Sequence, residues 1–300
     1  MSDRPDKLVV NCLPLREDER APFIVAAGKI RQVFVGDVAQ RDDMTWRPHL
    51  PEEYREAATA IIGNAPATEV SLCPNVEWMQ TNSAGTGSYV APGVLPEGAC
   101  LTSASGAYGQ SVSETMLAHT LALMKNLHLY RDRQCEGAWQ DEGQALTPAG
   151  ATVLVVGTGD IGSHYATAMA ALGARTVGVR RDASKPAAGV DEMHTFEELD
   201  ALLPEADVVA MSVPATPQTH HLIDARRLGL MKASAIIVNA GRGTAIDTDA
   251  LTEALAGGMI RGAGLDVTDP EPLSPGHPLW SEPRCLITPH VAGGNHLAAT

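Results

Sequence analysis

The stretch VLVVGTGDIGSHYATAMAALG, residues 153–173, decides the fold. An apolar run typical of a buried strand leads into three glycines in GxGxxG spacing, and an alanine-rich segment typical of a helix follows. In this context Gly157 permits a tight turn, Gly159 lets the backbone approach a pyrophosphate, and Gly162 lets the helix pack close to the strand. The N–H groups of the loop, including those of Asp160 and Ile161, would then face the anion. The stretch therefore predicts a dinucleotide-binding unit, with a chance glycine loop as the alternative.

The same alternation of apolar runs and helical segments extends in both directions from this loop. Strand-like runs recur downstream in ADVVAMSV, SAIIVNAG and RGAGLDV, and upstream in LVVNCL, TAIIGN and VEWMQT. A helical pattern over residues 103–134 links the two halves. Strands that alternate with helices favour parallel sheets. The predicted fold class is α/β, with two Rossmann-like or flavodoxin-like parallel-sheet domains: a first domain over 1–102 and a doubly wound dinucleotide-binding domain over 103–286.

The composition narrows the class of protein. A chain of 300 residues that is 44% hydrophobic and 19% charged fits a globular protein of about two domains. No apolar run approaches the ~20 residues that cross a bilayer. The N-terminus is typical of a first strand rather than a signal peptide, so we expect a cytoplasmic protein without a membrane partner. Five cysteines without a CxxC pair predict neither a disulfide framework nor a metal site, and a net charge of −14 argues against a nucleic-acid partner.

A basic turn follows the second strand of the predicted dinucleotide domain. NAD-binding domains usually end this strand with an acidic residue that holds the ribose 2′-hydroxyl, but here it ends in Arg180 and Arg181, with Lys185 close behind. Two guanidinium groups would pair with a 2′-phosphate through charge-assisted hydrogen bonds. We therefore expect NADP as the cofactor, with NAD as a possible substitute. A solvated basic loop is the alternative.

Three residues of the second half have the side chains that hydride transfer to a 2-oxo acid requires. Arg242 follows one strand-like run, Glu271 follows the next, and His290 follows the last. Catalytic groups of open α/β sheets gather at the carboxyl ends of strands, so these residues could converge. Singly, each has another interpretation: a surface arginine on a turn, a solvated carboxylate and a packed histidine.

The segments that carry these residues resemble a known family. VNAGRGTAID (238–247), LDVTDPEPLSPGHPLW (265–280) and ITPHVAGG (287–294) are similar to the three signatures of the D-isomer-specific 2-hydroxyacid dehydrogenases. That family includes glyoxylate/hydroxypyruvate reductases, D-lactate dehydrogenases and phosphoglycerate dehydrogenases. The resemblance implies a substrate domain that the chain leaves and re-enters, so that residues 287–300 return to the first domain. It also implies a homodimer that acts on a small 2-oxo or 2-hydroxy acid.

The resemblance assigns a role to each matching position. Arg242 corresponds to the substrate-binding arginine, His290 to the general acid/base, and Glu271 to the carboxylate that keeps the histidine protonated. In TNSAGTGSY (81–89), the N–H groups of Ala84 and Gly85 match a turn that binds the substrate carboxylate. Further cofactor contacts are expected at Val213, Pro214, Ala240 and Asp266, of which Asp266 would accept a hydrogen bond from the nicotinamide carboxamide.

Two departures from the family pattern accompany these assignments. Relatives usually continue some tens of residues past the histidine signature, with a helix that returns to the first domain, whereas this sequence stops at GGNHLAAT (293–300). Either the sequence is cut short or the closing helix is lost. In the turn, Gly87 stands where many relatives have Asp. A relative that shares the fold but serves as a dinucleotide-sensing scaffold is the alternative to an enzyme, and the intact Arg242, Glu271 and His290 favour the enzyme.

Overall fold

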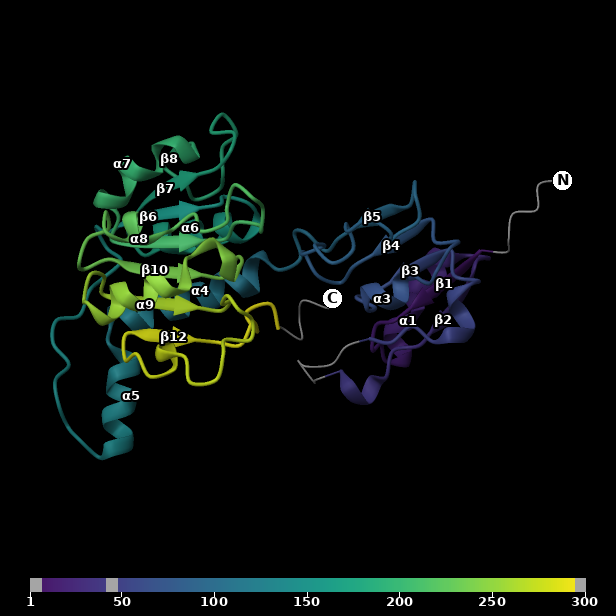
Figure 1. Cartoon of the computed structure of the whole chain (residues 1–300), viewed down its shortest axis with the longest axis horizontal. Coiled ribbons are helices and arrows are strands. Elements are labelled where there is room, and N and C mark those ends of the chain that lie inside the picture. The colour runs from purple at the N-terminus through teal and green to yellow at the C-terminus, as the bar shows by residue number, and fades with distance from the viewer. Residues whose placement is uncertain (1–6, 42–47, 295–300) are drawn as a thin grey trace. The chain divides into compact units, whose positions relative to one another are not determined.

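The computed structural model describes residues 7–41 and 48–294, which divide between two compact units over 1–107 and 108–300. Each unit contains one parallel β-sheet, and every strand pair in both sheets is parallel. The predicted α/β class with two parallel-sheet domains is therefore confirmed (Figure 1). The boundary between the units falls five residues after the predicted end of the first domain, directly before a long helix.

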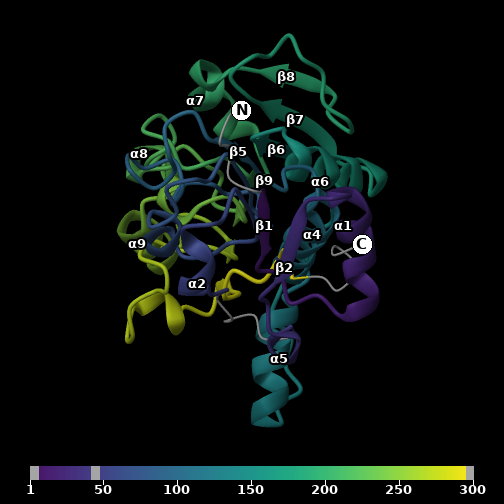
Figure 2. The ribbon, with the colours of Figure 1, turned by 90° about the vertical axis from the view of Figure 1, so that its right-hand side faces the viewer.

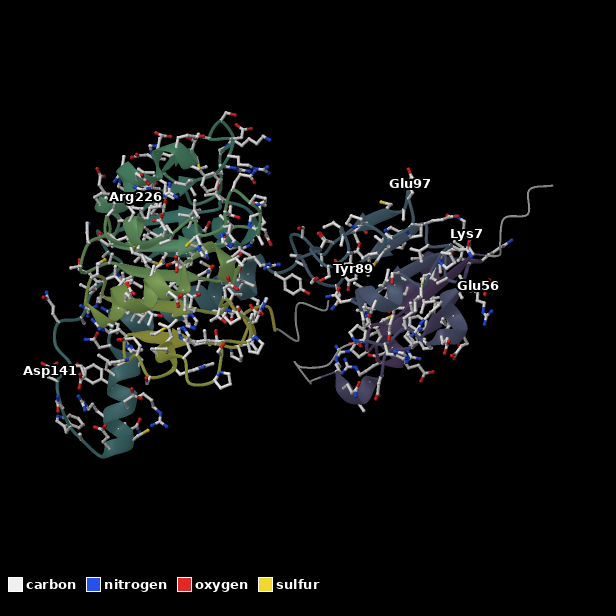
Figure 3. All side chains as sticks on the ribbon, viewed as in Figure 1. Lys7, Glu56, Tyr89, Glu97, Asp141 and Arg226 are labelled. Atoms are coloured by element: carbon white, nitrogen blue, oxygen red, sulfur yellow. The ribbon has the colours of Figure 1, made fainter. Side chains whose placement is uncertain are left out.

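The first unit contains a five-stranded sheet in the order β2-β1-β3-β4-β5. Its strands are β1 (Leu8–Asn11), β2 (Arg31–Phe34), β3 (Ala60–Ile62), β4 (Trp78–Gln80) and β5 (Cys100–Thr102). The helical segments are α1 (Glu17–Ala27), η1 (Val38–Gln40), α2 (Glu52–Arg55) and α3 (Ala67–Val70). Tyr89, labelled in Figure 3, packs into the apolar core of this unit. Its hydroxyl donates a hydrogen bond of 2.8 Å to the Ala65 carbonyl.

The second unit contains a seven-stranded sheet in the order β12-β11-β10-β9-β6-β7-β8. Its strands are β6 (Thr152–Val156), β7 (Arg175–Val179), β8 (Glu192–His194), β9 (Val208–Met211), β10 (Ile236–Asn239), β11 (Gly262–Leu265) and β12 (Cys285–Ile287). Its helical segments are α4 (Gly109–Met124), α5 (Leu127–Glu136), α6 (Asp160–Ala171), η2 (Phe196–Glu198), α7 (Leu199–Leu202), η3 (Leu203–Glu205), α8 (Ala225–Leu228), η4 (Gly243–Ala245), α9 (Thr248–Ala256) and η5 (Pro278–Trp280).

Helices cover both faces of this second sheet. Alternate residues of β6 point to opposite faces, as the two-residue period of a strand requires: Val153 and Val155 join one core, and Leu154 and Val156 join the other. The first core is closed by α4 and α6, and the second by α7, α8 and α9. Burial on both faces explains why the central strands are continuously apolar rather than alternating.

The prediction of one continuous helix over 103–134 is wrong, because the chain forms two helices there. α4 ends at Met124 and α5 starts at Leu127, with Asn126 between them in the left-handed region at φ 56°. The Asn126 side chain donates 3.0 Å to the Glu142 carbonyl and accepts 2.9 Å from Arg261. These bonds stabilise a conformation that asparagine tolerates better than most residues. As a result α5 extends away from the sheet of its own unit in Figures 1 and 2.

The segment that was expected to return to the first domain begins inside the second sheet. Ile287 ends β12, and Ala292 packs in the core closed by α4 and α6. Residues 295–300, the remainder of that segment, lie outside the described residues. Its return to the first domain therefore stays a prediction. Within 7–41 and 48–294, no helix combines the length and the apolar character needed to span a membrane.

Candidate active site

Loops that carry most of the predicted site residues follow neighbouring strands of the second sheet. Because all of its strands are parallel, their carboxyl ends meet at one edge. Strand order alone therefore places the loops in a row, spaced by about 4.8 Å per strand. From β12 to β7 the row contains His290, Asp266, Arg242, Val213, the glycine loop and Arg180. Ala84 and Gly85 belong to the first unit, which has its own sheet.

The glycine loop follows β6, where the strand order reverses between β6 and β9. This switch point is where ligands bind in open α/β sheets. A Cβ atom on Gly162 would lie 2.0 Å from the Gly157 carbonyl oxygen, so only glycine allows α6 to start this close to β6. A Cβ atom on Gly159 would meet nothing within 4 Å, which leaves its backbone open to a ligand. With the free N–H groups of the first helical turn, this loop fits a pyrophosphate.

The start of α6 also contains one acidic side chain. Asp160 lies in the first turn, and its carboxylate is 3.4 Å from Nδ1 of His164, one turn further along. An aspartate there interacts favourably with the helix dipole. Ile161 packs partly buried against the core beneath the loop. The expected contribution of Asp160 and Ile161 to the loop therefore comes from their backbone N–H groups.

The basic turn after β7 has free guanidinium groups. Within the described ranges, no hydrogen bond or ion pair involves the side chain of Arg180 or Arg181, whereas Lys185 pairs with Asp182 at 3.4 Å. The Arg180 N–H donates 3.1 Å to the His194 carbonyl and so fixes the turn against β8. This arrangement leaves two positive charges able to bind an anion beside the glycine loop.

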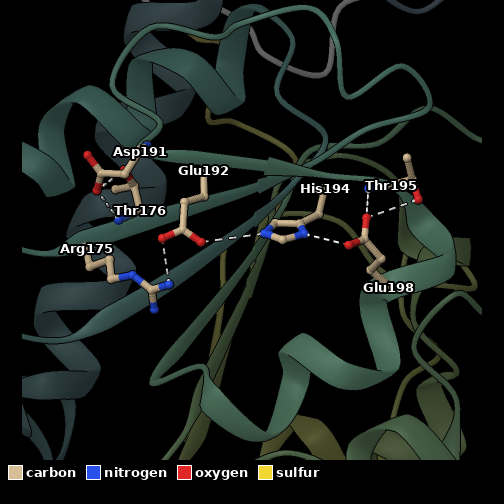
Figure 4. A network of polar contacts seen from close by, with 7 residues as sticks. All are labelled: Arg175, Thr176, Asp191, Glu192, His194, Thr195 and Glu198. Carbon is tan, nitrogen blue, oxygen red and sulfur yellow. Dashed lines mark hydrogen bonds and ion pairs between the residues drawn. The ribbon is translucent and has the colours of Figure 1, made fainter.

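A network of ion pairs holds the edge strand β8 against β7 (Figure 4). Arg175 pairs with Glu192 at 2.9 Å at one end, and His194 contacts Glu198 at 2.9 Å at the other. The Thr176 hydroxyl donates 3.1 Å to Asp191. These contacts are the physical reason why the register next to Arg180 is defined although β8 has only three residues.

The loops after β9 and β10 pack on each other. Val213 is 2% exposed, and the Ala240 N–H donates 3.1 Å to the Met211 carbonyl. A Cβ atom on Gly241 would lie 2.7 Å from the Val213 carbonyl oxygen, so glycine is required at this approach. Pro214 accepts 2.6 Å from the Thr219 hydroxyl, which closes the loop after β9.

Arg242 is positioned by a buried asparagine that sequence reasoning missed. Asn239, the last residue of β10, is 1% exposed, donates 2.9 Å to the Arg242 carbonyl and accepts 3.0 Å from the Gly241 N–H. The Arg242 side chain donates 2.6 Å to the Gly241 carbonyl. A polar residue that ends an otherwise apolar strand was the signal for this turn. The strand therefore delivers a partly exposed guanidinium to the carboxyl edge.

The structure brings His290 and Glu271 into direct contact. Nδ1 of His290 lies 2.5 Å from Oε1 of Glu271, and the two side chains are 48% and 43% exposed. The other ring nitrogen, Nε2, has no partner within residues 7–41 and 48–294. His290 itself adopts a left-handed backbone conformation with φ 54°. A histidine whose Nδ1 is held by a carboxylate presents Nε2 for proton transfer.

Asp266 follows β11, and its side chain is occupied by protein groups. The residue is 2% exposed, and its Oδ1 accepts 2.6 Å from the Thr288 hydroxyl and 3.0 Å from the Val291 N–H. The cofactor contact expected for Asp266 stays a prediction. Thr288, like Asn239, escaped the sequence reasoning, because a threonine before a proline carries no distinctive pattern.

In the first unit, the segment with Ala84 and Gly85 follows β4 and is held by its own side chains. The Thr81 hydroxyl donates 2.8 Å to the Ser83 carbonyl, and the Ser83 hydroxyl donates 2.7 Å to the Gly85 carbonyl. No backbone hydrogen bond from the Ala84 or Gly85 N–H is present among the described residues. Two free N–H groups in a fixed turn form a suitable site for a carboxylate.

Comparison with known proteins extends this picture. A family model described as D-isomer specific 2-hydroxyacid dehydrogenase, NAD binding domain, matches residues 117–292. An uncharacterised protein of Corynebacterium melassecola is 35% identical over 244 residues, 79% of each chain. A glyoxylate reductase of Thermofilum pendens is 30% identical over 269 residues, 85% of this chain and 79% of that protein.

Solved structures agree with these relatives. An NADPH-dependent glyoxylate/hydroxypyruvate reductase of Sinorhizobium meliloti, solved with NADP and sulfate, superposes with a TM-score of 0.78 and 25% identity, covering 98% of this chain and 91% of that chain. The predicted enzyme class and the nicotinamide dinucleotide cofactor are confirmed by these matches. This chain belongs to the D-isomer specific 2-hydroxyacid dehydrogenase family of NAD(P)-dependent oxidoreductases.

Proposed function

We propose that this protein reduces a small 2-oxo acid of the glyoxylate or hydroxypyruvate type to the D-2-hydroxy acid, with NADPH as the preferred reductant. The observation that carries the proposal is the 2.5 Å contact between His290 and Glu271 at the sheet edge that also holds Arg242 and the glycine loop. The relative in Thermofilum pendens is a glyoxylate reductase, which supports this substrate class.

The proton-transfer step is assigned to the histidine pair. The cofactor, when bound, supplies the hydride to C2 of the oxo acid and accepts it in the reverse direction. His290 donates a proton from Nε2 to the oxygen on C2, while Glu271 stabilises the charged imidazole from the Nδ1 side. In oxidation, the neutral His290 removes that proton from the hydroxyl group. The contact with Glu271 fixes the ring so that one nitrogen always faces outward.

Substrate binding is assigned to positive and N–H groups. Arg242 would hold the substrate carboxylate and the developing negative charge on oxygen, for which a permanently charged guanidinium is suited. In the first unit, the N–H groups of Ala84 and Gly85 are further candidates for binding a carboxylate. In this proposal the first unit is the substrate domain and the second unit is the dinucleotide domain.

Cofactor binding is assigned to the glycine loop and the basic turn. Gly157, Gly159 and Gly162 shape the pyrophosphate site, and Arg180 and Arg181 would bind the 2′-phosphate of NADP. Val213, Pro214 and Ala240 would line the nicotinamide end. The Sinorhizobium meliloti reductase was solved with NADP, which supports this preference.

A substrate panel tests the proposal. Purified protein is mixed with NADPH or NADH and a series of 2-oxo acids that includes glyoxylate, hydroxypyruvate and pyruvate, and the loss of absorbance at the nicotinamide band is followed. We expect turnover with short 2-oxo acids and a higher kcat/KM with NADPH. Cofactor binding by fluorescence titration, without turnover of any acid, would instead favour the dinucleotide-sensing scaffold. Sedimentation of the same sample tests the homodimer that the family implies.

A further inference from the structure

Asp266 is bonded to one loop through both of its carboxylate oxygens. Oδ1 accepts from the Thr288 hydroxyl at 2.6 Å and from the N–H groups of Val291 and Ala292 at 3.0 and 3.2 Å. Oδ2 accepts from the Ala292 N–H at 3.1 Å. The Asp266 main-chain carbonyl accepts 2.8 Å from the N–H of His290. A single residue therefore contacts the histidine loop, residues 288–292, on both sides of His290.

The conformation held in this way is a costly one. His290 has φ 54°, in the left-handed region that non-glycine side chains rarely adopt. Such a backbone persists only where the surrounding structure determines it. The bonds from Thr288, Val291 and Ala292 converge on the Asp266 carboxylate, so they fix the loop before and after the strained residue. The orientation of the imidazole toward Glu271 depends on that backbone.

The carboxylate is buried among the donors of this loop. Asp266 is 2% exposed, and both of its oxygens already accept from the loop. His119, whose ring packs across Gly264 two residues earlier, does not offset the charge, because burial lowers the pKa of this histidine and keeps it neutral at neutral pH. Stabilisation of the Asp266 charge comes from the hydroxyl and N–H donors of the histidine loop. The Asp266 carboxylate and the histidine loop therefore stabilise each other.

We propose that Asp266 is a positioning residue, which holds residues 288–292 so that His290 stays in contact with Glu271. The expected change in kcat rests on the proposed acid role of His290. The expected change in hydrogen exchange of residues 288–292 does not depend on that role. A loosened loop would misplace the imidazole, and a displacement near 1 Å in an active site can reduce the rate about 10²-fold.

The test uses Asp266→Asn and Thr288→Val in the full chain. An amide at position 266 places an NH₂ group against N–H donors, and Thr288→Val removes one donor while keeping the shape. We expect kcat to fall about 10²-fold for Asp266→Asn and less for Thr288→Val. We also expect faster hydrogen exchange in peptides that cover residues 288–292. Thr288→Ser, which keeps the hydroxyl, should keep kcat and the exchange of residues 288–292 close to those of wild type.

A matched control separates positioning from general loss of stability. Thr176→Val removes the hydroxyl of another threonine that bonds to an aspartate, Asp191, at 3.1 Å between β7 and β8 (Figure 4). It should leave kcat and exchange of the histidine loop unchanged. Unchanged kcat together with unchanged loop exchange in Asp266→Asn would overturn the inference.

The exchange measurement also keeps this inference separate from the proposed function. If His290 variants retain turnover, the acid role fails, yet faster exchange of residues 288–292 in Asp266→Asn still supports the positioning role. If Asp266→Asn does not fold, Thr288→Val decides by the same readouts, because it removes a single hydrogen bond. Unchanged loop exchange in Thr288→Val would then count against the inference.

Discussion

The carboxyl edge of the second sheet is built differently at its two ends. At the β11 and β12 end, Asp266 accepts bonds from three residues of the histidine loop, and His290 contacts Glu271 at 2.5 Å. At the β7 end, the side chains of Arg180 and Arg181 have no bonded partner within residues 7–41 and 48–294. One end is fixed by hydrogen bonds, and the other leaves its charged groups free.

This difference matches what the proposed function requires of each end. Proton transfer depends on the position of one nitrogen atom to a fraction of an ångström, so the group that performs it has to be held in advance. Binding of a phosphate depends mainly on charge, and guanidinium groups on flexible stems can meet it as it arrives. Substitutions at the fixed end should therefore change the rate, and substitutions at the free end should change cofactor affinity.

The largest effect is expected at the fixed end. His290→Ala removes the proton donor, so turnover should fall about 10²- to 10⁴-fold, while the dissociation constant of NADPH stays near that of wild type. Steady-state kinetics and fluorescence titration measure the two quantities. His49→Ala is a matched control, since His49 also contacts a carboxylate, Glu69, at 2.7 Å but lies in the first unit. A His290 variant with ordinary turnover would remove the distinction between the two ends.

The next effect is expected at the free end. Replacing Arg180 and Arg181 together by Gln should weaken NADPH binding about 10- to 100-fold and change NADH binding little, because charged hydrogen bonds to a phosphate contribute about 1.5–3 kcal/mol. Titration with both cofactors at low and high salt measures this change. Arg226→Gln is the control, because Arg226 on α8 is exposed and pairs with Asp200 at 2.7 Å (Figure 3). Equal losses for NADPH and NADH would show that the turn does not select the 2′-phosphate.

A smaller effect should separate the two members of the catalytic pair. Glu271→Gln keeps the shape of the side chain but removes the charge next to Nδ1 of His290. A neutral amide replaces a charge-assisted hydrogen bond with a weaker one, so the imidazole is held less firmly and the rate of reduction at neutral pH should fall severalfold. Steady-state kinetics at pH 7 measure this change. An unchanged rate would mean that the contact with Glu271 does not contribute to turnover.

Much of this edge could be predicted from sequence, because its signals are local. The GxGxxG loop lies between an apolar run and an alanine-rich segment, so Gly157, Gly159 and Gly162 could be placed on a strand–turn–helix from chain order alone. Because strand-like runs alternate with helical segments, parallel sheets were predicted, and a parallel sheet brings carboxyl ends together. The contact between His290 and Glu271 then required only that β11 and β12 be neighbours.

Other features depend on contacts between residues far apart in sequence. The bonds from Asp266 to Thr288 and Ala292 cross 22 and 26 positions, and no pattern within either segment indicates them. The break between α4 and α5 was missed because Asn126 continues a helical pattern in sequence, while its side chain is held by Glu142 and Arg261. Sequence reasoning therefore named the proposed catalytic residues and Asp266, but it missed Asn239, Thr288 and the contacts that hold these loops.

The smallest effect concerns stability at the fixed end. Burial lowers the pKa of His119 below its ordinary value of 6.5, so the unfolded chain takes up a proton at a higher pH than the folded chain does. The stability that the neutral His119 contributes is thus present above about pH 6.5 and is lost as the pH falls below it. His119→Leu should reduce the loss of unfolding free energy between pH 7 and pH 5 in urea titrations. Identical losses in wild type and variant would show that His119 is not the group responsible.

The same variant also probes how the fixed end is held. His119 packs across Gly264, and Asp266 lies two residues further along the chain. If the donors of the histidine loop alone hold the Asp266 carboxylate, kcat at pH 7.5 should be close to that of wild type in His119→Leu. A large fall in kcat at that pH would instead mean that the packing of His119 beneath β11 is itself part of what keeps His290 in place. The fixed end would then extend from the loop into α4.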